Sequence, residues 1–170
     1  MHIRIPTDRI AVLIGRDGGA KRMLEKATHT RIEVEENTAT VAGGPLEEMA
    51  AIEVIKAIGR GFSPEKALKL LDEEYSLEII RLDDMTEKGR KRVLGRVIGE
   101  NGRARRILEE YTSSDIAVYG RTISLIAKHA DARLACDAIE LLIAGRSHKY
   151  VYLALVKKIT AEKGFARGAL

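Results

Sequence analysis

The chain has 170 residues, of which 45% are hydrophobic and 32% are charged, and it contains one cysteine. This composition excludes a disordered chain, a disulfide framework and a Cys-rich metal site, and it suits one ordinary domain or two small ones. The net charge of +4 permits a polyanionic partner without requiring one.

Cys136, the lone cysteine, is expected in the core, and its isolation favours a reducing compartment. Residues 1–8 contain no apolar signal core. No stretch approaches the roughly 18 apolar residues that span a bilayer. We therefore expect a soluble, cytoplasmic protein that does not enter a membrane.

A shift of the chain by 84 residues aligns residues 14–34 with residues 98–118, and 10 of these 21 positions are identical. Chance would give roughly one or two identities, so the match is an internal repeat. Each copy retains both glycines of a Gly-x-x-Gly motif. The sequence therefore predicts two domains of the same fold, residues 1–74 and residues 75–170.

In the first copy, an alternating pattern predicts a strand at residues 1–6, and a capped apolar stretch predicts a helix at 9–14 that the first glycine ends. A second helix is expected at 19–28. Two alternating segments around Asn37 predict a hairpin. A long amphipathic helix closes the copy, and its buried face is expected to contain Ala51, Val54, Ile55 and Ile58.

The second copy repeats this order. Its strands are expected at 77–82, 115–119 and 122–127, its first two helices at 90–98 and 103–112, and its closing helix buries Ala135, Ala138, Ile139 and Leu142. Helical patterns beginning at Ser63 and around Tyr152 predict an extra helix after each copy, packed between or beside the domains and joining them rigidly. The fold class is α+β, with two three-stranded antiparallel sheets, each carrying helices on one face.

Two glycines spaced Gly-x-x-Gly between helices allow a tight turn that a phosphodiester chain can approach. The segments 12–24 and 95–108, which contain Ile14-Gly15-Arg16-Asp17-Gly18 and Ile98-Gly99-Glu100-Asn101-Gly102, resemble the KH signature. The glycines follow a single strand, as in type I KH domains (β-α-α-β-β-α). The resemblance implies a loop that clamps about four nucleotides of single-stranded RNA beside an aliphatic groove.

The resemblance implies that several residues of the motif contact RNA. In the first copy they are Gly15, Arg16, Asp17, Gly18, Lys21 and Arg22; in the second they are Arg96, Ile98, Gly99, Glu100, Asn101, Gly102, Arg103, Arg105, Arg106, Ile107 and Ile116. The groove walls would be Ile14, Met23 and Ile32 in the first copy and Ile98, Ile107 and Ile116 in the second. Each of these apolar residues is equally compatible with an ordinary core position.

Charge separates the two copies. Residues 1–74 carry 11 basic and 13 acidic residues, a net of 11 − 13 = −2, and residues 75–170 carry 18 and 12, a net of 18 − 12 = +6. Each glycine loop contains one acidic residue, Asp17 or Glu100, where KH loops are commonly basic. We therefore expect the second domain to bind RNA more strongly.

Catalysis is not expected. The glycine loops lack the Lys-Ser or Lys-Thr ending of a nucleotide-binding loop, the four histidines are scattered, and no metal-ligand spacing occurs. We expect no cofactor, no metal and no small-molecule substrate.

Two KH modules with a short helical spacer resemble the archaeal KH proteins related to the eukaryotic partner of the NOB endonuclease. That resemblance implies a role in small-subunit ribosomal RNA processing, with binding near the 3′ end of the 16S rRNA. It also implies contacts with the NOB-type endonuclease and with the α subunit of translation initiation factor two. Two alternatives remain open from the residues: a protein-interaction scaffold with incidental RNA contact, and a general single-stranded nucleic-acid regulator.

Overall fold

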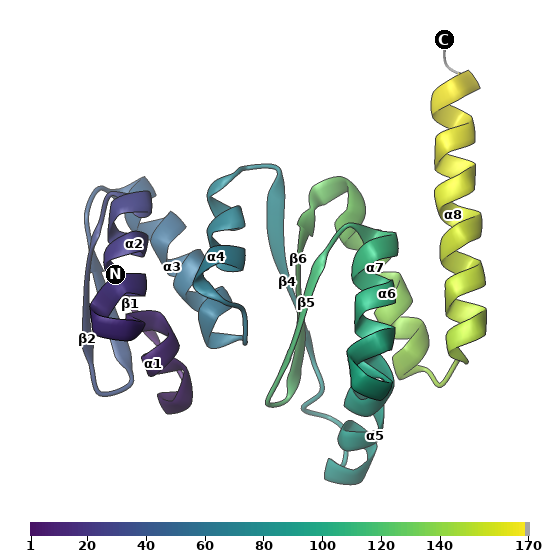
Figure 1. The fold of residues 1–170 in the computed structure, drawn as a ribbon, viewed down its shortest axis with the longest axis horizontal. Coiled ribbons are helices and arrows are strands. Elements are labelled where there is room, and N and C mark those ends of the chain that lie inside the picture. The colour runs from purple at the N-terminus through teal and green to yellow at the C-terminus, as the bar shows by residue number, and fades with distance from the viewer. Residues whose placement is uncertain (169–170) are drawn as a thin grey trace.

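The computed structural model describes residues 1–168, and it contains two units with the same order of elements (Figure 1). The first unit consists of β1 (His2–Arg4), α1 (Thr7–Ile14), α2 (Gly19–Thr28), β2 (Arg31–Glu35), β3 (Thr38–Ala42), α3 (Pro45–Gly59), α4 (Pro64–Ala67) and a 3₁₀ turn, η2 (Leu68–Leu71). The second consists of β4 (Tyr75–Arg81), α5 (Glu87–Ile98), α6 (Arg103–Thr112), β5 (Asp115–Tyr119), β6 (Thr122–Lys128), α7 (His129–Ile143) and α8 (His148–Gly168).

Each unit has its own three-stranded antiparallel sheet, in the order β1-β3-β2 and β4-β6-β5. The hairpins share one register, because Ile32 pairs with Val41 in the first unit and the equivalent Ile116 pairs with Leu125 in the second. The expected α+β class and the two separate antiparallel sheets are thereby confirmed.

Three helices cover one face of each sheet. The closing helices α3 and α7 bury the predicted face, since Ala51, Val54, Ile55, Ile58, Ala135, Ala138, Ile139 and Leu142 are all at most 2% exposed. Cys136 differs from the expectation: it lies at the margin of the second core and is only partly buried.

Several identical polar positions of the repeat serve the same structural purpose in both units. Glu25 accepts a hydrogen bond from the backbone N–H of Ile32, and Glu109 does the same for Ile116, at 2.8 Å in each case. Burial opposes ionisation of Glu25, but this hydrogen bond and Lys21 outweigh it, so the pKa of Glu25 lies below its ordinary value. These bonds fix the second helix of each unit against the strand that follows it.

The outer face of the second sheet packs against the first unit. Ala117 and Ile126 belong to the same buried cluster as Phe62 and Ala67. Strand β6 is consequently buried on both sides, with all residues from Thr122 to Ala127 inaccessible. The expectation that each sheet buries one face is therefore wrong for the second sheet, because α4 and η2 occupy its outer face.

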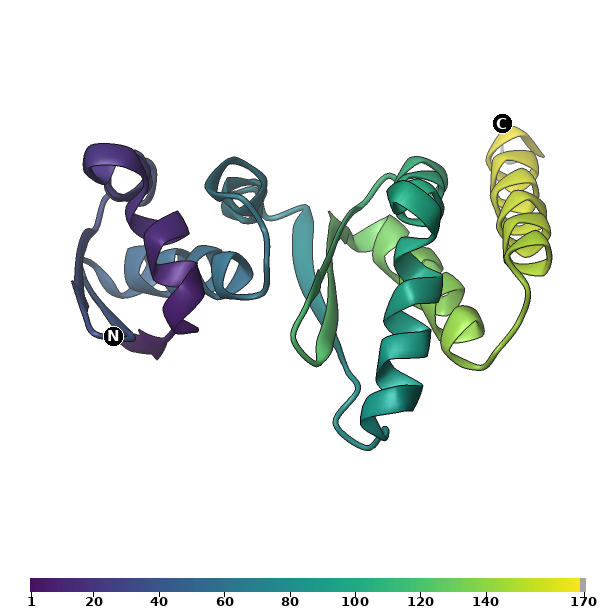
Figure 2. The same cartoon turned by 60° about the horizontal axis from the view of Figure 1, so that its bottom comes forward.

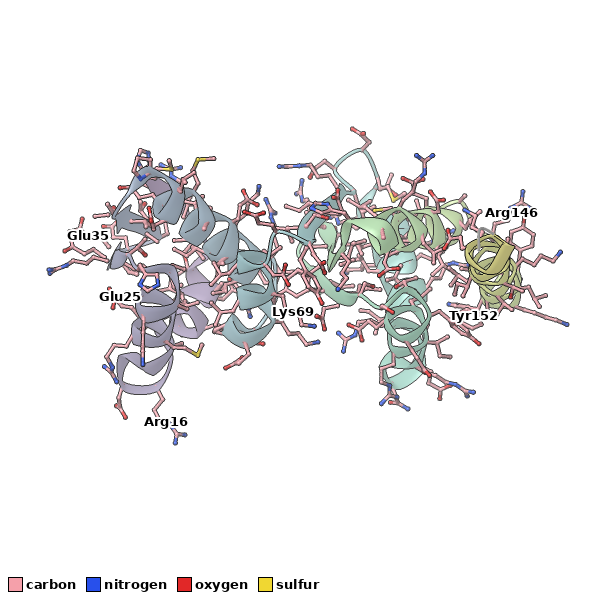
Figure 3. The ribbon with its side chains drawn as sticks, turned by 90° about the horizontal axis from the view of Figure 1, so that it is seen from above. Arg16, Glu25, Glu35, Lys69, Arg146 and Tyr152 are labelled. Carbon is pink, nitrogen blue, oxygen red and sulfur yellow. The ribbon has the colours of Figure 1, made fainter. Side chains whose placement is uncertain are left out.

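Polar contacts cross the same junction. Asp115 on β5 accepts hydrogen bonds from Lys69 at 2.5 Å and pairs with Lys66 at 3.0 Å. The Tyr119 hydroxyl donates to Asp8 at 2.5 Å, and the Arg9 guanidinium lies 5.9 Å from the Tyr119 ring centre. Figure 3 shows Lys69 where the two units meet.

Asp115 should make stability depend on pH. Burial opposes its ionisation, but Lys69 and Lys66 outweigh burial and hold the pKa of Asp115 below its ordinary value. A depressed folded-state pKa gives a contribution that is present above the unfolded pKa and is lost as pH falls below about 4. Asp115→Asn should therefore reduce the loss of stability between about pH 5 and 3 in urea unfolding. Glu35→Gln, which alters an exposed carboxylate, is the matched control; equal pH slopes for Asp115→Asn and the unaltered protein would contradict the assignment.

The helices that follow the two copies, α4 and α8, pack in different positions. Helix α4 lies between the units, as expected, whereas α8 packs against α6 and α7 on the side away from the first unit (Figures 1 and 2). The expectation that both helices join the units is wrong for α8. Ser63 and Ser147, 84 positions apart, nevertheless accept the corresponding N-terminal hydrogen bonds, so α8 begins as the counterpart of α4.

Among the described residues, no helix has both the length and the apolar character needed to cross a membrane. Within the same residues, no three His, Cys, Asp or Glu side chains are grouped as metal ligands.

Candidate nucleic-acid interface

The two glycine loops have the same backbone conformation. Gly15 and Gly99 have φ/ψ of 72°/178° and 71°/179°, and Gly18 and Gly102 have 74°/15° and 72°/14°. Positive φ with ψ near 180° is essentially restricted to glycine. The repeated motif therefore encodes the same turn in both units.

The first glycine of each loop is also required by packing. A Cβ at Gly15 would lie 2.6 Å from the Cβ of Ala20, and a Cβ at Gly99 would lie 2.6 Å from that of Ala104. The second glycines have more room, since a Cβ at Gly102 would meet only an Arg105 nitrogen at 4.0 Å. The close approach at the first glycine brings each loop against the start of the next helix.

Helices α2 and α6 begin directly after these loops, with Gly18 and Gly102 as their N-cap residues, and neither has a side chain capping its N-terminus. The N–H groups of Gly19 and Arg103 donate to the loop carbonyls of Arg16 and Glu100. The N–H groups that follow in the first turn of a helix have no partner within the helix. Such a terminus favours an anion, because the N–H groups point outward and the helix dipole is positive there. Both loops are therefore suited to hold a phosphate.

Arg22 and Arg106 brace the loops from the following helix. Arg22 donates from Nη1 to the carbonyl of Asp17 at 2.7 Å, and Arg106 donates from Nη2 to the carbonyl of Asn101 at 3.3 Å. This role was not predicted, although the identity of the two arginines in the repeat was a signal for it. Each guanidinium retains further N–H groups for an anion.

Most of the expected polar contact residues are accessible. Those exposed are Arg16, Asp17, Arg22, Glu100, Asn101, Arg103 and Arg106. The acidic side chains thus lie in solvent beside the turn. Asp17 and Asn101 have φ of 50° and 51°, and Asp and Asn tolerate this left-handed conformation better than most residues.

The other three basic residues expected to contact RNA, Lys21, Arg96 and Arg105, are partly buried. Lys21, the counterpart of Arg105, pairs with Glu25 at 3.1 Å. Arg96 donates to the carbonyl of Arg146 in the turn before α8, and His148 contacts the Arg96 carbonyl at 2.7 Å. The geometry therefore gives Arg96 a structural contact with the α7–α8 turn instead of a place beside the loop.

The expected groove walls separate into two groups. Ile32 and Ile116 are 0% and 4% exposed and belong to the cores, so their side chains cannot reach a base in the intact fold. Ile14, Met23, Ile98 and Ile107 are partly exposed. Ile107, however, faces a groove beside α8.

Comparison with known proteins identifies the second unit. The family described as "Eukaryotic type KH-domain (KH-domain type I)", of the PNO1 type, matches residues 76–160. The KH domain-containing protein MJ0443 of Methanocaldococcus jannaschii is 38% identical over 164 residues, covering 92% of the chain and 72% of the relative. The chain belongs to the PNO1-type family of KH-domain proteins.

A further relative and a solved structure have informative names. The pre-rRNA-processing protein PNO1 of Debaryomyces hansenii is 28% identical over 125 residues, and the match covers 71% of the chain and 48% of the relative. The crystal structure of an a/eIF2alpha-aDim2p-rRNA complex from Pyrococcus horikoshii OT3 matches with a TM-score of 0.86 and 40% identity, covering 93% of the chain and 92% of the matched one.

Proposed function

We propose that the chain is an RNA-binding protein of small-subunit ribosomal RNA processing, built from two tandem type I KH domains, residues 1–74 and 75–170. The observation that carries the proposal is the repeated glycine loop, which leaves the starts of α2 and α6 without a capping side chain. Support for both domains comes from their common strand and helix order, and the family match at residues 76–160 supports the second directly.

The second domain is the main RNA site in this proposal. Its half of the chain carries the net charge of 18 − 12 = +6. Arg103 and Arg106 are exposed beside its loop. We propose that the ligand is the 3′ region of the small-subunit rRNA, which agrees with the pre-rRNA-processing name of the Debaryomyces relative and with the rRNA in the Pyrococcus complex.

The proposed protein partners are the α subunit of translation initiation factor two and the NOB-type endonuclease. The first is supported by the a/eIF2alpha chain named in the Pyrococcus complex. The second rests on the resemblance to the processing proteins. In this proposal the chain acts in the cytoplasm and positions RNA without performing covalent chemistry, using neither cofactor nor metal.

RNA affinity should fall steeply as salt rises, because cations that neutralise phosphates release condensed counterions. A loop that holds about four nucleotides neutralises roughly three or four phosphates, so affinity should drop about 20- to 50-fold between 50 and 200 mM salt. Fluorescence anisotropy with an oligonucleotide of the 16S 3′ end would measure this change, and an affinity indifferent to salt would argue against phosphate binding.

A panel of oligonucleotides at fixed salt completes the test. Preference for the ribosomal 3′ end over scrambled RNA and DNA supports the proposal. Equal affinity for every strand would indicate a general single-stranded nucleic-acid regulator. Absence of binding would indicate a protein scaffold.

A further inference from the structure

Helix α8 and the body of the second unit enclose a groove of about 790 Å³. Its apolar lining comprises Ile107, Tyr111, Leu134, Tyr152, Val156 and Ile159. Tyr111 and Tyr152 stack with their ring centres 6.5 Å apart. Tyr111 and Val156 are each 42% exposed, so the groove presents apolar surface to solvent.

The charged part of the lining is acidic. Glu110, Asp131 and Glu162 line the groove, whereas none of its lining residues is Lys or Arg. None of the three carboxylates forms an ion pair with another side chain in the described part of the chain. An acidic groove therefore lies in the half of the chain that carries a net positive charge.

The groove is separate from the RNA site proposed above. Glu109, the residue before Glu110 on α6, accepts a hydrogen bond from Ile116 on β5, whereas Ile107 and Tyr111 face α8. Tyr152 on α8 is labelled in Figure 3, at the end of the molecule away from the first unit. The glycine loop precedes the N-terminus of α6, and none of its residues lines the groove, so an occupant of the groove would contact α8 and the later part of α6.

We propose that this groove binds a basic amphipathic segment of a partner protein. Apolar side chains of the segment would pack on Tyr111, Tyr152 and Val156, and its Lys or Arg side chains would approach the three carboxylates. Aromatic faces also attract cations, so the tyrosines suit the same ligand. RNA is disfavoured, because its phosphates would meet carboxylates without a compensating cation in the lining.

The probe for this proposal is a fluorescein-labelled peptide of about 18 residues, with Lys and Leu spaced so that one helical face is apolar. Two matched peptides replace every Lys by Glu or every Leu by Ser. We expect the Lys-Leu peptide to bind and to shift the NMR amide signals of the residues lining the groove. Both matched peptides should bind at least about tenfold more weakly, because one lacks the basic side chains and the other lacks the apolar face.

Glu110→Lys combined with Glu162→Lys should weaken the Lys-Leu peptide about tenfold, since two exposed attractions become repulsions. Glu35→Lys combined with Glu140→Lys makes the same charge change at exposed positions outside the groove and should leave its affinity unchanged. Tyr111→Ser tests the apolar contact without a charge change and should also weaken binding. Thermal unfolding checks that each variant is folded, and none should lower RNA affinity.

Other outcomes would overturn the proposal. These are equal losses from the two charge pairs, NMR shifts outside the groove, preference for the Glu peptide, or no peptide binding. Displacement of the peptide by an RNA oligonucleotide at the groove would assign the surface to nucleic acid. Self-association of the protein that Tyr111→Ser abolishes, measured by sedimentation, would assign it to a second copy of the chain. RNA affinity is measured separately, so failure here leaves the RNA-binding proposal untouched.

Discussion

Gly99→Ala is expected to lower the free energy of unfolding by about 3 to 5 kcal/mol, because it combines backbone strain with overpacking. The φ and ψ of Gly99 lie in a region that alanine avoids. The new methyl group would also lie 2.6 Å from the Cβ and 2.8 Å from the backbone nitrogen of Ala104. Urea unfolding followed by circular dichroism would measure the loss.

Gly102→Ala is the matched control within the same loop. Its φ of 72° is also left-handed, but a Cβ there would meet only Arg105 at 4.0 Å. Strain alone should cost about 1 to 2 kcal/mol. If the two alanine variants lose equal stability, crowding against Ala104 is not what selects glycine at the first position.

Adding a carboxylate to the second loop is expected to weaken RNA binding by roughly 5- to 150-fold, which corresponds to about 1 to 3 kcal/mol of repulsion from phosphate. The change is Glu100→Asp together with Asn101→Asp, which adds one negative charge at exposed positions. Asp tolerates the left-handed conformation of Asn101, so the fold should be kept. Anisotropy titration with the 16S 3′ oligonucleotide would measure the affinity.

The substitution Arg16→Asp in the first loop tests which domain contributes more to RNA binding. It removes a cation and adds an anion, so it is the harsher change in local charge. Arg16 lies at the tip of the first unit in Figure 3, far from the second. A smaller loss from Arg16→Asp than from the second-loop pair would identify the second domain as the principal site. A larger loss would show that this assignment is wrong and that the positive charge of the second half serves another partner.

The fold of each unit could be predicted from sequence because the repeat shows the same local signals twice. Alternating strands, amphipathic helices and glycine-terminated turns are encoded within short segments, and the structure contains all of them. The glycine loop was predictable for the same reason. Its requirement for Gly15 and Gly99 comes from conformation and from an alanine only five residues away.

The contacts between elements could not be predicted in the same way. Burial of the outer face of β6 depends on α4, which is distant in sequence. The sequence contained a signal for it, because Ala117 and Ile126 occupy the positions of Glu33 and Ala42 in the first unit. Arg96 is basic and close to the loop in sequence, but its side chain turns toward Arg146. Side-chain direction and long-range packing therefore decided which predicted site residues reach the surface.

The two units meet in one direction, with the helical end of the first against the outer sheet face of the second. Indefinite extension of such an asymmetric contact from molecule to molecule would produce a filament. The first sheet offers no apolar face for another molecule, because Arg31, Glu33 and Glu35 are exposed on it. Figure 3 shows Glu35 at the outer side of the first unit. These charges resemble the polar cap of a terminal repeat, and they disfavour docking of another molecule's apolar helical end on this sheet.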